Sequence, residues 1–97
     1  MPQDWPVGWM AIDDNNERSK FEAELTREMP RGHLLFDENA RVVARRGRRD
    51  DFLFELSGGR LAQVHLTWAK ETDPFWPSTE VYSSYQDWIT ALDGDEC

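Results

Sequence analysis

The stretch DFLFELSGGRLAQVHLTW, residues 51–68, contains two alternating apolar runs separated by Gly58 and Gly59. Two such runs joined by glycines are typical of a β-hairpin, which we expect at the centre of a small sheet. A two-residue turn would put the phenylalanines with the polar residues of the second run, so we predict a three-residue loop over Gly58, Gly59 and Arg60. With one glycine in the left-handed conformation, this loop gathers seven apolar side chains on one face. They are Phe52, Phe54, Leu56, Ala62, Val64, Leu66 and Trp68.

The opposite face of the hairpin is the more polar one. The stretch RVVARR, residues 41–46, reads as a further strand beside the hairpin. If Ala44 lies opposite Phe54, Val42 and Ala44 join the apolar face and Arg45 points to the polar face. The predicted polar sheet face, a candidate ligand site, therefore consists of Arg45, Glu55, Gln63, His65 and Thr67.

Helical patterns flank the strands on both sides. Asp14 and Glu17 have the spacing of a capping box, and Pro30 ends the helix that follows. A second helix starts at Ser83 or Ser84 and ends at Gly94. Its apolar face has helical spacing and consists of Tyr85, Trp88, Ile89 and Leu92.

The order of these elements predicts one α+β domain over residues 1–97. It consists of a helix, an antiparallel sheet of three or four strands, and a C-terminal helix, with the helices covering one face of the sheet. The optional fourth strand is residues 33–36, which otherwise form a loop over the core. Residues 1–12 are expected to be an extended arm docked through Trp9 and Ile12.

Composition narrows the function classes. The net charge is −8, which disfavours nucleic acid as a partner and favours a basic protein. The only cysteine is Cys97, so no disulfide can form within the chain. We find no signal peptide and no apolar run of membrane-spanning length, and we therefore expect a soluble cytoplasmic protein with no membrane partner.

Few residues suggest a chemistry. The only histidine and cysteine side chains are His33, His65 and Cys97, which lie far apart, so we predict no metal site and no cofactor. His65 beside Glu55 has the residue types for acid–base work, but the sequence places no nucleophile next to them, and we predict no enzyme. A polar ladder on a wet sheet face is the alternative. The arginine-rich turn at residues 45–49 either grips phosphate or is a solvated turn.

The residues after Trp68 are the candidate partner-binding site. Pro74 and Pro77 bracket two large aromatic residues, which makes a rigid loop with an acidic rim. Tryptophan is enriched at the centres of interfaces, whereas the alternative is that the loop extends the core. The candidate residues are Trp68, Glu71, Asp73, Phe75, Trp76 and Glu80.

Three blocks resemble a group of small, uncharacterised bacterial proteins. The blocks are VVARRGRRDDFLFEL at 42–56, VHLTW at 64–68 and FWPSTEVYSSYQDW at 75–88. The resemblance covers roughly residues 33 to 88. It implies a bacterial source and a stand-alone domain, and it assigns no catalytic residue.

Three functions follow as hypotheses. The first is an acidic cytoplasmic module that binds a partner protein, in the manner of an immunity protein or an inhibitor. The second is a small ligand-binding domain or enzyme that uses the polar face around His65. It gains weight if Arg45, Glu55 and His65 converge in a concave pocket and do not lie on a flat face. The third is self-association into a homodimer through the same face or an edge strand.

Overall fold

The computed structural model describes residues 5–6, 8–47, 50–68 and 77–95. Within them the chain forms two α-helices and five strands, which confirms the α+β class and adds strands to the three or four expected. The elements in order are β1 (Trp9–Ala11), α1 (Asn15–Glu28), β2 (Arg41–Arg46), β3 (Asp51–Glu55), a 3-10 turn (Ser57–Gly59), β4 (Leu61–His65), β5 (Ser78–Tyr82) and α2 (Tyr85–Asp95).

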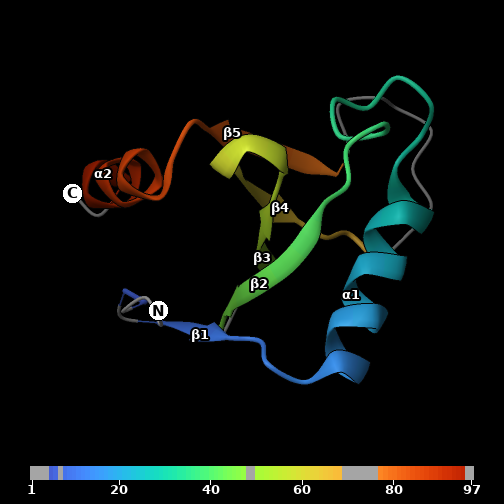
Figure 1. Cartoon of the computed structure of the whole chain (residues 1–97), viewed down its shortest axis with the longest axis horizontal. Helices are drawn as coiled ribbons and strands as arrows, with labels where there is room; N and C mark the ends of the chain where they lie inside the picture. Colours follow the sequence, from blue (N-terminus) through green and yellow to red (C-terminus); the bar gives the residue numbers. More distant parts are fainter. Residues whose placement is uncertain (1–4, 7, 48–49, 69–76, 96–97) are drawn as a thin grey trace.

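The sheet is an antiparallel meander with the spatial order β1-β2-β3-β4-β5. Figure 1 shows α1 on one side of the sheet and α2 on the other. We call these two sides the α1 face and the α2 face. The prediction that both helices cover one face is therefore wrong, because each face carries enough apolar side chains to require a helix of its own.

The central hairpin has the odd-length loop that its pattern predicts. The loop occupies residues 57–59, one residue earlier than expected, and the Leu56 amide donates to the Arg60 carbonyl at 2.9 Å to close it. Phe52 therefore pairs with Val64 and Phe54 with Ala62. The register differs from the predicted one by two residues, so the side chains of residues 51–56 and 61–66 stay on their predicted faces.

Two consecutive glycines make this loop possible. Gly58 and Gly59 have φ values of 77° and 81°, in the left-handed region, and a Cβ on either would meet no neighbouring atom. The strain of that backbone for a residue with a side chain is about 1–2 kcal/mol. We expect Gly58→Ala or Gly59→Ala to lower the free energy of unfolding in urea by about this amount. Ser57→Ala in the same loop should change it by less than about 0.5 kcal/mol.

The strand β2 contains an irregularity that the sequence did not predict. Val42 pairs with Phe54, but Ala44 pairs with Leu53, so Val43 is an extra residue in the ladder. Because such a β-bulge inserts one residue, the side chains after it point to the opposite face of the sheet from the one that regular alternation predicts. Ala44 consequently packs on the α2 face, and the prediction that it joins Val42 on the hairpin's apolar face is wrong.

The N-terminal part of the chain follows its sequence pattern closely. Trp9 and Ile12 are buried, as expected for a docked arm, and the arm also pairs with β2 as the short edge strand β1. The Asp14 carboxylate accepts from the Asn16 amide at 3.2 Å and caps α1. Residues 33–36 form turns rather than a strand, with Leu35 buried in the core.

The α1 face holds the larger core. Phe21 and Leu25 of α1 lie over β2, β3 and β4, and the Phe21 and Phe52 ring centroids are 4.4 Å apart. Burial of these apolar side chains drives the packing of a helix whose own sequence is mostly polar. The cluster consists of Ile12, Phe21, Leu25, Leu35, Val42, Phe52, Phe54, Leu56, Ala62, Val64 and Leu66.

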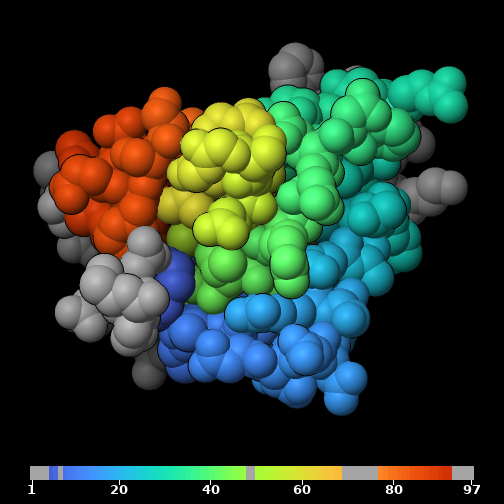
Figure 2. All heavy atoms as spheres, viewed as in Figure 1, coloured from blue at the N-terminus to red at the C-terminus, as the bar shows by residue number. Residues whose placement is uncertain are grey.

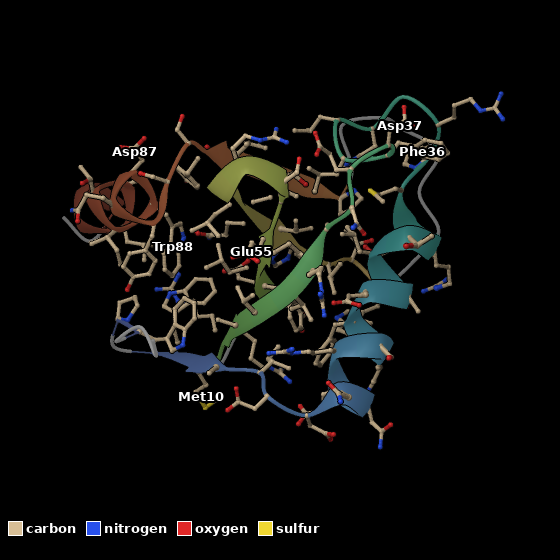
Figure 3. All side chains as sticks on the ribbon, viewed as in Figure 1. Met10, Phe36, Asp37, Glu55, Asp87 and Trp88 are labelled. Carbon is tan, nitrogen blue, oxygen red and sulfur yellow. The ribbon has the colours of Figure 1, made fainter. Side chains whose placement is uncertain are left out.

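The α2 face is built around Trp88. Figure 3 shows this side chain pointing from α2 toward the sheet, whereas Asp87 points away. The Trp88 ring stacks edge-on against Trp9 at 5.0 Å and Trp5 at 6.0 Å. Ser84 accepts from the Asp87 amide at 3.2 Å and so caps the helix, as the sequence predicts.

The two helices flank the hairpin loop on the outer surface. Figure 2 shows this loop, in yellow, between the orange residues of α2 and green residues, beyond which lie the blue to teal residues of α1. In the described part of the chain, no helix is long and apolar enough to cross a membrane.

Candidate functional site

A polar pocket of about 370 Å³ opens on the α2 face of the sheet. Strands β3, β4 and β5 supply its floor, and Ala91 of α2 forms one wall. Helix α2 covers the end of this face near Leu61 and Tyr82, and the pocket lies toward the other end. The lining residues are Asp51, Gln63, His65, Ser78, Glu80, Tyr82 and Ala91.

Antiparallel register assembles the pocket from three strands. Asp51 of β3 lies directly opposite His65 of β4, which in turn lies opposite Ser78 of β5. Gln63 and Glu80 form the next row on the same face. Directly opposed residues have Cβ atoms about 4.5–5.5 Å apart, so side chains in each row are within reach of one another.

Asp51 fixes the orientation of His65. Its Oδ1 atom lies 2.8 Å from Nδ1 of the ring, and Arg46 lies 3.9 Å from the other carboxylate oxygen. An ionised carboxylate only accepts hydrogen bonds, so Nδ1 carries the proton and donates it. In the neutral ring, Nε2 is then the acceptor. Asp51 is buried while the His65 side chain is half exposed, so the ring can meet a ligand.

Trp88 fixes the orientation of Gln63 in the same way. The indole Nε1 donates to Gln63 Oε1 at 2.9 Å, and an indole nitrogen only donates. The Gln63 amide nitrogen therefore keeps its two donors. Glu80 is exposed at the pocket rim, and its carboxylate has no ion pair with any residue that the structure describes.

The pocket gathers part of the predicted polar face. Gln63 and His65 lie in it, as predicted, whereas Glu55 is exposed outside it, opposite Leu61. Arg45 was predicted on this face and lies on the other one, because the bulge at Val43 turns it toward α1.

Arg45 instead stacks on the aromatic rings of the α1 face. Its Cζ atom is 5.3 Å from the Phe21 ring centroid and 5.2 Å from that of Phe52. Its Nε atom is buried and has no hydrogen-bond partner among the described residues. The guanidinium thus contributes cation–π packing, and its neighbours in the arginine turn, Arg48 and Arg49, lie outside the described residues.

The predicted partner-binding loop lies mostly outside the described residues, namely Glu71, Asp73, Phe75 and Trp76. Trp68 is described and packs on the α1 face, with its ring centroid 6.2 Å from that of Phe52 and 42% of its surface exposed. Glu80 lies on the opposite face, in the pocket. Trp68 and Glu80 therefore do not share one surface.

A second polar cluster joins the end of α1 to the residues after β4. Glu28 is fully buried and accepts from the backbone amides of Thr67 at 2.8 Å and Trp68 at 2.7 Å. The Thr67 hydroxyl donates to the same carboxylate at 3.1 Å. Thr67 therefore lies toward α1 and not on the polar sheet face with His65, where it was predicted, because strand β4 ends at His65. Burial and a hydrogen bond with Glu24 raise the pKa of Glu28 to about 7. Its place at the negative end of the helix dipole acts in the same direction.

His33 holds the start of β5 in place. The ring Nδ1 accepts from the Leu35 amide at 3.1 Å, so Nε2 carries the proton and donates to the Pro77 carbonyl at 2.8 Å. Because His33 is buried and both nitrogens are used, its role is to connect the 33–36 loop to β5. It thereby positions Ser78 and Glu80 at the pocket.

Sequence reasoning missed Asp51, Ser78 and Tyr82 as pocket residues. Asp51 was missed because the predicted register, two residues off, placed it opposite Thr67 instead of His65. Ser78 and Tyr82 were missed because no strand was predicted over residues 78–82. The alternation of Thr79 and Val81 with polar residues is a strand signal that was available.

Comparison of the chain with protein-family models, with curated proteins and with solved structures finds no match. The site must therefore be interpreted from its own geometry. In the part of the chain that the structure describes, no three histidine, cysteine or acidic residues are grouped to hold a metal ion.

The row Asp51–His65–Ser78 contains the residue types of an acid, a base and a nucleophile. The bond from His65 to Asp51 is present, whereas none of the described contacts joins Ser78 to His65. Nucleophilic catalysis needs that contact and an oxyanion site as well. What the geometry supports directly is recognition of a ligand by hydrogen bonds.

Proposed function

We propose that this protein is a binding module that accepts a basic side chain of a partner protein in the pocket on the α2 face. The observation that supports the proposal is the exposed carboxylate of Glu80 at the pocket rim. Glu80 has no counter-charge among the described residues, and Asp51 orients His65 so that its Nε2 atom also accepts. A guanidinium, with five donors and one positive charge, complements such a site.

The charge of the whole chain supports the same class of partner. A net charge of −8 attracts a basic protein over long range and increases the rate of encounter. This proposal keeps a protein partner of the immunity or inhibitor kind. It keeps Glu80 from the candidate partner-binding residues and adds the pocket to the others, which are Trp68, Glu71, Asp73, Phe75 and Trp76. A bacterial source, a cytoplasmic location and the absence of catalytic activity remain predictions.

The first test uses N-acetyl-arginine methylamide as a probe, titrated into the protein and followed by NMR at the His65 ring and the Gln63 amide. We expect Glu80→Gln and Asp51→Asn each to weaken binding about tenfold or more, because a hydrogen bond to a charged group contributes roughly 1.5–3 kcal/mol. Glu55→Gln is the matched control, since Glu55 is an exposed acid outside the pocket. Equal weakening by Glu55→Gln would show that only general charge matters, and the pocket proposal would be wrong.

A further inference from the structure

Strand β5 is a sheet edge suited to pairing. In the described part of the chain it pairs only with β4, so the backbone groups along its other side face away from the sheet. Its five residues pair in continuous register from Ser78 to Tyr82 and include no proline and no lysine. Proteins usually protect an edge with such residues, with a bulge or with other charged side chains, and Glu80 is the one charged residue of β5. The opposite edge, β1, has only three residues.

The two faces of β5 differ in chemistry. Ser78, Glu80 and Tyr82 face the pocket, whereas Thr79 and Val81 face the α1 side of the sheet. Val81 is 39% exposed although it is a large apolar residue. A strand lying against β5 would place alternate side chains on these two faces.

We infer that the partner segment binds as an added strand along β5, with basic residues on the pocket side alternating with apolar residues on the Val81 side. This inference rests on the proposed function, because the pocket selects the basic residue. Strand addition takes affinity from backbone hydrogen bonds and specificity from pockets for alternate side chains. Here the pocket provides specificity for the basic residues of the partner strand. Val81 provides apolar area for the apolar residues that alternate with them.

Charge favours a basic partner strand over a second copy of the chain as the occupant of the β5 edge. In a two-fold antiparallel pairing of β5 with itself, Glu80 of one copy lies close to Glu80 of the other near the middle of the strand. Like charges in such cross-strand positions are destabilising. Each copy also carries a net charge of −8, whereas a basic strand meets both the local and the overall charge favourably.

The test uses an acetylated, amidated eight-residue peptide that alternates arginine with valine, measured by calorimetry at near-physiological ionic strength. Two matched peptides carry N-methyl groups on alternate backbone amides, one on each of the two sets. An added strand donates hydrogen bonds to β5 from only one of the two sets of alternate amides. The peptide methylated on that set should bind at least tenfold more weakly, and the other should bind about as well as the parent. The amides on the outer side of β5 should exchange more slowly with solvent in the complex.

Two protein variants serve as controls, and three outcomes would overturn the inference. Glu80→Gln should weaken the parent peptide about tenfold, and Glu55→Gln should not. Equal binding of both N-methylated peptides, with the Glu80→Gln effect retained, would leave the pocket proposal standing and rule out strand addition. If no arginine probe binds, both proposals fail. A dimer of the free protein that protects the β5 amides would identify a second copy as the occupant.

Discussion

Trp88→Ala should lower the free energy of unfolding by about 3–5 kcal/mol, the range for truncating a large buried aromatic side chain. Trp88 is fully buried and stacks against Trp5, Trp9 and Tyr85. The substitution removes these contacts and leaves the acceptor of Gln63 without its indole donor. A domain of this size has a total stability of roughly 5–15 kcal/mol, so a large fraction of it would be lost.

Urea unfolding followed by circular dichroism measures this effect. Trp88→Phe should cost less than Trp88→Ala, because an aromatic ring remains and only the indole donor and part of the ring volume are lost. Met10→Ala is the surface control, since Met10 is 53% exposed and points away from the sheet (Figure 3), and it should change stability by less than about 0.5 kcal/mol. A Trp88→Ala protein as stable as the wild type would mean that α2 does not pack on the sheet in solution.

The second large effect is a dependence of stability on pH that originates at Glu28. Its pKa is raised from 4.5 to about 7 in the folded protein. Between these values the folded state binds more protons at Glu28 than the unfolded state does. The stabilisation is therefore complete below about pH 4.5 and is lost as the pH rises through 7. The contribution is at most about 3 kcal/mol.

Comparison of the wild type with Glu28→Gln isolates this residue from the other carboxylates. The amide side chain of the variant cannot titrate, so the stability difference between the two proteins should change between about pH 4.5 and about pH 7, in favour of the variant at the higher pH. The absolute stability of the variant is not the test, since an amide cannot accept from both the Thr67 and Trp68 amides as the carboxylate does. A difference that stays constant over this range would contradict the raised pKa.

The same packing that stabilises the domain also prepares the pocket. Trp88 orients Gln63, and His33 holds Pro77 at the start of β5, so both buried groups act on residues that line the pocket or lead into it. The pocket therefore depends on α2 and on the 33–36 loop as much as on the hairpin. Variants that loosen either element should weaken binding of the arginine probe together with stability.

Local patterns in the sequence were sufficient for the central hairpin and the helix starts. Alternation with period two assigns residues 51–56 and 61–66 to their faces, and that assignment survives a register shift of two residues. The caps at Asp14 and Ser84 likewise depend only on residues two to three positions away. These features are decided within one or two turns of chain, so they can be predicted without knowing the fold.

The pocket and the placement of the helices depended on distant residues. The same alternation permits Asp51 to face His65 or Thr67, and only packing of the whole sheet selects His65. The bulge at Val43 places Ala44 in the α2 cluster and turns Arg45 to the other face, and the strand's own sequence does not show this bulge. Helix α2 covers the face opposite α1 because apolar side chains gather there and need to be buried. These side chains come from four separate strands and are Trp9, Ala44, Leu53 and Leu61. Burial of such a dispersed set is a property of the tertiary structure alone.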